Sequence, residues 1–219
     1  MGADETREDI ERFAQVVLER YDVSSVVDIG CGRGQYIERF HDAGVDVLGV
    51  ERSTYALDNP IDEDLDIRQH DLTEPFHLDD EADIDLCIEV LEHLPPEAAP
   101  TAARTIAAAA PVAIVTAAAS GQGGKHHVNE QPLDYWIDLF TGVGMVFDAS
   151  ATDEIREAMA GSNLAWLNEN LASYLAMRGL NCSSTTVYRS MRRRTLSASL
   201  RRIGCRSHHA CRSSNQRRS

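Results

Sequence analysis

A glycine-rich turn near the N-terminus carries a carboxylate beside it. Asp28 lies near the end of the apolar run that begins at Ser24, and Gly30, Gly32 and Gly34 follow at alternate positions. Glycines permit positive φ and let a ligand lie against the backbone, and the helix expected after them offers free N–H groups. A tight turn alone would also explain the glycines. A carboxylate here would repel a pyrophosphate, however, so the pattern favours a ligand that carries an amino group.

Two further acids end the next two predicted strands. Glu51 closes the run from Leu48, and Asp71 follows Gln69 and His70. A carboxylate at the end of the second strand can accept hydrogen bonds from both hydroxyls of a ribose, the role that an acid has in dinucleotide folds. Asp71 could bond an adenine amino group. Both residues could instead be surface acids of an acid-rich chain, and this alternative is stronger for Asp71.

Taken in order, these strings resemble the motifs of the class I methyltransferases that depend on S-adenosylmethionine (SAM). The resemblance runs from about Val23 to Ala176, and its strings are Asp28–Gly34, Glu51, Asp71–Leu72 and Asp83–Leu94. It implies a three-layer, doubly wound, mostly parallel seven-stranded sheet whose last strand is antiparallel. It also implies a set of cofactor-binding residues. Asp28, Gly30 and Gly32 contact the methionine part of SAM, Glu51 the ribose, Asp71 and Leu72 the adenine, and Glu89 the cofactor rim, with Cys31 and Arg52 beside them.

Three histidines are candidates for catalysis. His93 follows the fourth predicted strand, and His126 and His127 lie in a loop after the fifth. Their loop resembles that of some small-molecule and glycan methyltransferases. Because the methyl group of SAM is already activated, the enzyme mainly has to align a nucleophile with it, and a base helps if the acceptor is a hydroxyl. Histidine titrates near neutral pH, although these side chains could equally serve only to shape the loop.

A metal site is a second interpretation of the same region. Glu89, Glu92 and His93 would share one face if a helix begins there, and with His126 or His127 they could bind a divalent cation. Small-RNA 3′-terminal 2′-O-methyltransferases use a similar set. The same string is common in methyltransferases without metal, and the aromatic and basic surroundings of the RNA enzymes are missing here, so we expect no metal.

The pattern of apolar residues predicts elements that can position these groups. Strands are expected at 24–29, 45–50, 66–70, 84–90, 112–116, 145–149 and 170–176, and helices at 5–20, 35–43, 95–110, 132–141 and 152–160. Alternating strands and helices indicate a parallel sheet covered on both faces. Ligands of such sheets bind beyond the carboxyl ends of the strands, which is where the candidate residues fall.

Charge divides the chain into two segments. Up to Met177 there are 10 Lys and Arg against 35 Asp and Glu, and from Arg178 onward there are 11 Arg and no acid, giving a net charge of −14. We expect residues 1–177 to form the methyltransferase domain and residues 178–219 to be a disordered Arg- and Ser-rich tail. The tail could bind nucleic acid, contact the acidic body, or be a non-native C-terminus. The acidic, lysine-poor body favours adaptation to a salty cytoplasm over a basic partner.

Several other classes of protein are disfavoured. No apolar run is long enough to span a membrane, Met1–Glu11 lacks the features of a signal peptide, and the five scattered cysteines form no CxxC pair. We therefore expect a cytoplasmic, halophilic protein.

The leading hypothesis is an enzyme that transfers a methyl group from SAM to a hydroxyl of a small molecule or glycan. Trp136 and Trp166 could contact such an acceptor, with core packing the better interpretation for Trp136. A metal-assisted RNA 2′-O-methyltransferase and a non-catalytic SAM-binding regulatory module are the alternatives. Binding of nucleic acid through the tail is not favoured, and an NAD-dependent dehydrogenase is disfavoured by the turn at Asp28.

Overall fold

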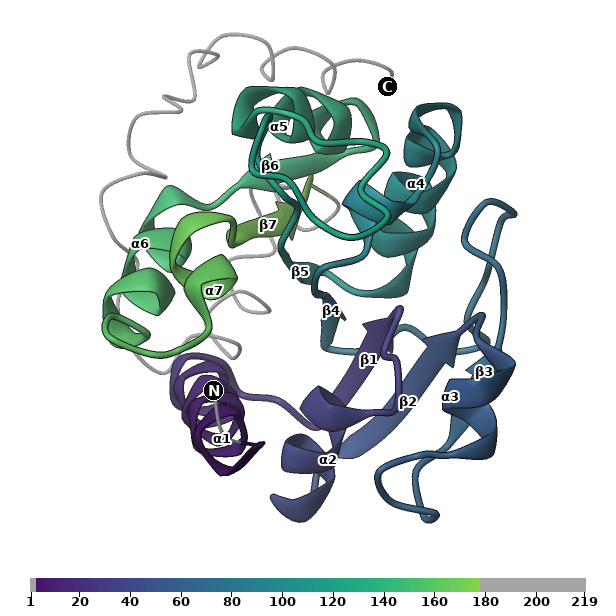
Figure 1. Ribbon diagram of the computed structural model, residues 1–219, viewed down its shortest axis with the longest axis vertical. Coiled ribbons are helices and arrows are strands. Elements are labelled where there is room, and N and C mark those ends of the chain that lie inside the picture. The colour runs from purple at the N-terminus through teal and green to yellow at the C-terminus, as the bar shows by residue number, and fades with distance from the viewer. Residues whose placement is uncertain (1–2, 178–219) are drawn as a thin grey trace, which may run out of the picture.

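The computed structural model describes residues 3–177, which contain a single seven-stranded sheet in the order β3-β2-β1-β4-β5-β7-β6 (Figure 1). The strands are β1 Ser25–Ile29, β2 Asp46–Glu51, β3 Ile67–Gln69, β4 Ile84–Cys87, β5 Val112–Val115, β6 Met145–Phe147 and β7 Ala172–Ala176. The first five pair in parallel, and β7 runs antiparallel to both β5 and β6. The predicted mostly parallel sheet with an antiparallel last strand is confirmed.

Helices cover both faces of this sheet. They are α1 Ala3–Arg20, α2 Gln35–Asp42, α3 Thr54–Asp58, α4 Ala99–Ala109, α5 Leu133–Gly142, α6 Ala149–Ala158 and α7 Ala165–Glu169, with short 3-10 turns η1 Leu91–His93 and η2 Pro96–Ala98. One apolar cluster joins α1, α2, α6 and α7 to one face of the sheet, and a second joins α4 and α5 to the opposite face. The predicted three-layer arrangement is therefore present.

The central strands are buried because they are covered from both sides. All four residues of β4 and all four of β5 are buried, as a parallel strand between two helical layers requires. Alanines make up most of α4, and Ala99, Ala102 and Ala103 are fully buried. Their small side chains let this helix lie close against the sheet.

The largest departures from the predicted elements are near β4 and in two short helices. The fourth strand ends at Cys87 rather than at residue 90, and Glu89 has φ +57°, a left-handed conformation that no strand residue adopts. The region of Glu92 and His93 is a single 3-10 turn rather than an α-helix. The helices α3 and α7 were not predicted, because five residues are too few to show a helical period. The predicted tail, residues 178–219, lies outside the described residues.

The strand order places a switch point between β1 and β4. The chain runs from β1 outward through β2 to β3 and then returns to β4 on the other side of β1. Connections therefore leave the carboxyl ends of β1 and β4 in opposite directions, which opens a crevice there. In residues 3–177 none of the helices has the length and apolar content needed to cross a membrane.

Candidate functional site

The turn after β1 is held against β2 by its backbone. The amide nitrogens of Gly30 and Cys31 donate to the carbonyl of Val50, at 2.7 and 3.1 Å. Gly30 has φ +86°, and a Cβ atom built on it would lie 2.4 Å from a methyl carbon of Val90. Only glycine combines this φ with such a close approach. The turn thus brings the backbone after β1 into contact with the segment after β4.

Glu51 organises the backbone around the end of β2. One carboxylate oxygen accepts from the amide nitrogen of Gly32 at 2.8 Å, and the other accepts from Arg52 and Ser53 at 2.8 and 2.7 Å. Hydrogen bonds to a carboxylate are charge-assisted and hold it in a defined position. Glu51 therefore joins the glycine turn to the turn between β2 and α3.

A cavity of about 300 Å³ lies over the glycine turn, on the side of β1 that faces α1. Asp28 lines it, together with Gly30, Cys31, Gly32 and Glu89. Burial, and then the charge of Glu51, raises the pKa of Asp28 to about 8. A ligand cation beside Asp28 would favour its ionised form. Burial also raises the pKa of Cys31 far above its usual range, so this thiol stays protonated.

A second cavity, of about 180 Å³, lies beyond the end of β2. The predicted residues Glu51, Arg52, Asp71 and Leu72 line it. Arg52 lies 3.5 Å from a carboxylate oxygen of Asp71. The pKa of Asp71 is lowered, first by a hydrogen bond from the backbone N–H of Thr73. The structure therefore brings all of these predicted residues to one edge of the sheet.

The two cavities meet at Gly30 and Glu89, which line both of them. Glu89 is fixed at this junction by the buried Thr116, which follows β5. The Thr116 hydroxyl donates to Oε1 of Glu89 at 2.9 Å and accepts from its amide nitrogen at 2.7 Å. These bonds support the left-handed conformation of Glu89. An elongated ligand could occupy both cavities, with its middle passing Gly30 and Glu89.

A cluster of Glu92, His93 and His127 borders the second cavity, which His93 also lines. One ligand atom from each residue lies within 4.8 Å of the other two. Glu92 is fully buried, and burial, followed by the charge of Glu89, raises its pKa to about 7. The side chain of His126 is exposed and does not join the cluster, but its backbone carbonyl lies 3.2 Å from Nδ1 of His93. Two of the three candidate histidines are therefore together.

Several lining residues were not predicted from the sequence. Ile10, Tyr36, Leu164 and Trp166 line the first cavity, and Trp166 Nε1 donates to the hydroxyl of Tyr36 at 3.4 Å. They belong to three helices far apart in the chain, so no local pattern connects them. Trp136 is buried in the core, as predicted.

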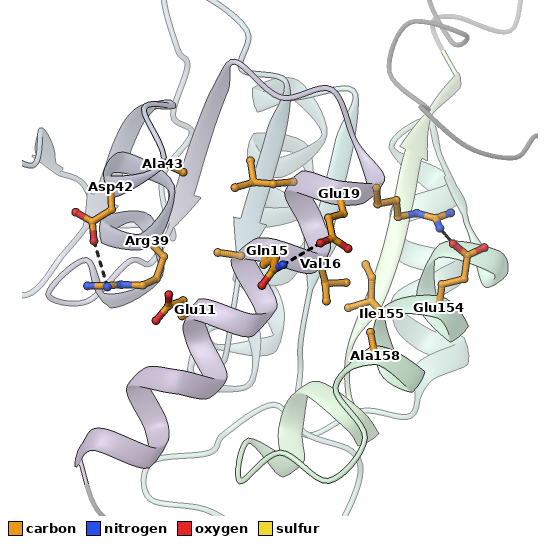
Figure 2. A pocket seen from close by; sticks show the side chains of 13 residues that line it. Glu11, Gln15, Val16, Glu19, Arg39, Asp42, Ala43, Glu154, Ile155 and Ala158 are labelled. Carbon is orange, nitrogen blue, oxygen red and sulfur yellow. Dashed lines mark hydrogen bonds and ion pairs between the residues drawn. The ribbon is translucent and has the colours of Figure 1, made fainter.

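A larger hollow, about 1030 Å³, lies elsewhere, between α1, α2 and α6. Figure 2 shows several of its polar side chains paired, with Gln15 reaching Glu19 and Arg39 reaching Asp42. None of the predicted site residues lines this hollow. It also lies away from the carboxyl ends of the strands, so we do not assign the cofactor to it.

Comparisons with known proteins agree with this fold. Residues 27–110 match the family model of the methyltransferase domain. Comparison with curated protein sequences gave no match. Among solved structures, the methyltransferase CcbJ of Streptomyces caelestis has a TM-score of 0.60 at 12% identity, over 77% of this chain and 89% of that one.

Two other solved structures are similar. Magnesium protoporphyrin IX methyltransferase from Synechocystis PCC 6803, with bound S-adenosylhomocysteine, has a TM-score of 0.56 at 14% identity, over 78% of this chain and 84% of that one. A putative methyltransferase of Haloferax volcanii, solved with a methyltransferase activator, has a TM-score of 0.56 at 19% identity, over 80% of this chain and 95% of that one.

These structural likenesses show the fold, and the family model adds the methyltransferase domain over the strands that build both cavities. Residues 27–110 therefore match a methyltransferase domain, and the fold around them is that of the class I SAM-dependent methyltransferases.

Proposed function

We propose that SAM lies across the ends of β1, β2 and β4 and fills both cavities. The observation that supports this most is that the cavities meet at Gly30 and Glu89 and carry acids at opposite ends. Asp28 would face the ammonium group of the methionine part, and Glu51 would accept the ribose hydroxyls. Asp71 and Leu72 would contact the adenine. The sulfonium would then lie near Glu89, at the junction.

We propose that the methyl acceptor is a hydroxyl of a small molecule or glycan. In the transfer, the acceptor oxygen bonds to the methyl carbon, the carbon–sulfur bond breaks, and its electron pair stays on sulfur as a neutral thioether. The hydroxyl proton must also be removed. The cluster of Glu92, His93 and His127 lies beside the cofactor junction, and we assign it this task. His126 remains a candidate for contact with the acceptor.

The placement of SAM is tested by Glu51→Ala. Loss of this carboxylate removes the acceptor for the ribose hydroxyls and also releases the amide nitrogens of Gly32, Arg52 and Ser53. We expect isothermal titration calorimetry to show SAM affinity reduced by at least about tenfold, the loss that corresponds to ~1.4 kcal/mol. The control is Glu63→Ala, which removes an equal charge from an exposed position. Equal SAM affinity in both variants would contradict the assignment of Glu51.

The acceptor class is tested with SAM that carries a labelled methyl group. We expect label to pass to hydroxyl compounds such as sugars and phenols, and not to RNA fragments. Transfer to the terminal 2′-hydroxyl of RNA would favour the RNA methyltransferase instead. Tight SAM binding without transfer to any acceptor would favour a non-catalytic regulatory module.

A further inference from the structure

The cluster of Glu92, His93 and His127 combines residues from two separate segments. Glu92 and His93 lie in the 3-10 turn η1 after β4, and His127 lies in the loop between β5 and α5. The backbone amides of Val128 and Asn129 both donate to the carbonyl of Glu92, at 2.9 and 3.0 Å. These bonds fasten the loop to the turn, so the proximity of the three side chains is built into the backbone.

Glu92 has no partner that would explain a buried carboxylate. It is 0% exposed, and neither of its oxygens has a hydrogen-bond partner in the described part of the chain. The backbone amides of Glu92 and Ala118 lie near enough to lower the pKa of this carboxyl, but neither has the geometry of a full hydrogen bond to it. Buried charges in proteins are normally paired or coordinate a metal. A cation among the three side chains would supply the missing partner.

Both histidines are oriented by oxygen atoms on their far side. Nδ1 of His127 lies 2.9 Å from Oε1 of Glu130, and Nδ1 of His93 lies 3.2 Å from the carbonyl oxygen of His126. An acceptor beside Nδ1 places the proton there and leaves the lone pair on Nε2. Histidines that bind metals commonly have such an oxygen behind them, which fixes the tautomer and raises the basicity of the ring.

We propose that Glu92, His93 and His127 bind one divalent transition-metal ion at the rim of the cofactor cavity. Two imidazoles and one carboxylate suit Mn²⁺, Fe²⁺, Co²⁺ or Zn²⁺. Ligand atoms at about 2.1 Å from one ion stand roughly 3–4 Å apart, so small side-chain rotations suffice from the separations of at most 4.8 Å. With only three protein ligands, the ion would keep at least one coordination position open for an oxygen atom of water or of the methyl acceptor.

The role of the ion follows from its position beside the junction of the cavities, and this role rests on the proposed function. An acceptor hydroxyl bound at an open position would lose its proton more readily, because the metal stabilises the oxygen anion. The proton would pass to solvent water, and the oxygen would take the methyl group while the bond electrons remain on sulfur. The histidines would then act as metal ligands rather than as the base.

The experiment measures binding of Mn²⁺ alone to the full-length protein by electron paramagnetic resonance. The samples also contain excess Mg²⁺, so that weak sites among the surface carboxylates are filled by Mg²⁺ and do not contribute to the Mn²⁺ count. We expect one Mn²⁺ per chain in the wild type, and affinity at least about tenfold weaker in Glu92→Gln and in His127→Ala. The control is His77→Asn, which removes an exposed imidazole that lines neither cavity; its affinity should be that of the wild type.

Two outcomes would overturn the proposal. The wild type could bind no Mn²⁺ under these conditions, or Glu92→Gln could bind the ion as tightly as the wild type. Thermal melting of each variant checks its fold, and the ion should raise the melting temperature of the wild type but not that of Glu92→Gln. Calorimetry with SAM on the same samples is a separate measurement. Metal binding without SAM binding would contradict the proposed function and leave the metal site standing.

Discussion

Asp28 combines complete burial with a place in the proposed cofactor cavity. Its pKa of about 8 in the unliganded protein lies far above the ordinary value of 3.8. Between pH 3.8 and about pH 8, Asp28 keeps its proton in the folded chain, whereas it has lost that proton in the unfolded chain. The stability that Asp28 contributes is therefore greatest below about pH 4 and falls as pH rises towards 8. The residue costs stability at neutral pH and becomes favourable when a cation binds beside it.

The variant Asp28→Asn should lose this pH dependence. Without SAM, we expect its melting temperature to exceed that of the wild type by more at pH 8 than at pH 5. For a domain of this size, each kcal/mol corresponds to about 2–4 °C. Its affinity for SAM should fall, because an amide cannot pair with the ammonium group. Melting curves that differ by the same amount at both pH values would show that Asp28 is not protonated in the folded protein.

Single residues at strand ends could be predicted from the sequence, whereas the contacts between distant segments could not. Asp28, Glu51 and Asp71 follow apolar runs, and parallel strands bring their carboxyl ends to one edge. His127 is separated from Glu92 by a helix and a strand. Sequence spacing suggested Glu89, Glu92 and His93 as one helical face, but the left-handed backbone at Glu89 places them differently. The oxygen partners of the histidines likewise depend on how the loop folds back.

Strands and long helices were predicted to within a few residues because their hydrophobic periods are clear. The strand at β4 was predicted too long, since Ile88 and Val90 continue the apolar pattern after the backbone has left the sheet. Beyond the end of β4, the chain is held by a contact with a neighbouring segment. Thr116, just beyond β5, holds both the amide nitrogen and the carboxylate of Glu89. The segment after β5 thus helps to set the backbone conformation of the segment after β4.

Thr116→Val tests this support. Valine keeps the shape of threonine but removes both hydrogen bonds to Glu89. We expect calorimetry to show SAM affinity reduced several-fold. The lost bond to the carboxylate is worth about 1.5–3 kcal/mol, and only part of this free energy would be lost from SAM binding. The matched control is Thr105→Val, the same change at a buried position of α4 that lines neither cavity. If both variants bind SAM as the wild type does, Glu89 does not depend on Thr116.

The charge of the whole chain predicts how it responds to salt. The sequence has 35 Asp and Glu against 21 Lys and Arg, and every acid precedes position 170. Repulsion among these carboxylates destabilises the compact state, and salt screens it, with a Debye length of about 10 Å at 0.1 M and about 3 Å at 1 M. We propose that the protein is adapted to high salt.

Thermal melting in KCl checks this proposal. We expect the melting temperature of the full chain to rise by several degrees between 0.1 and 2 M KCl. A melting temperature that is unchanged or lower at 2 M would contradict adaptation to salt. The same series on residues 1–177, which contain the complete sheet, would show whether the Arg-rich segment contributes by neutralising the acidic body.

The most direct test of the account is calorimetry of the wild-type chain with SAM, S-adenosylhomocysteine and NAD. Two cavities that meet at a glycine turn and carry Asp28 at one end and Glu51 at the other should bind one molecule of SAM or S-adenosylhomocysteine per chain. NAD should not bind, because its pyrophosphate would lie beside Asp28, whose carboxylate form needs a cation as its partner. Binding of NAD without binding of SAM would contradict the central claim.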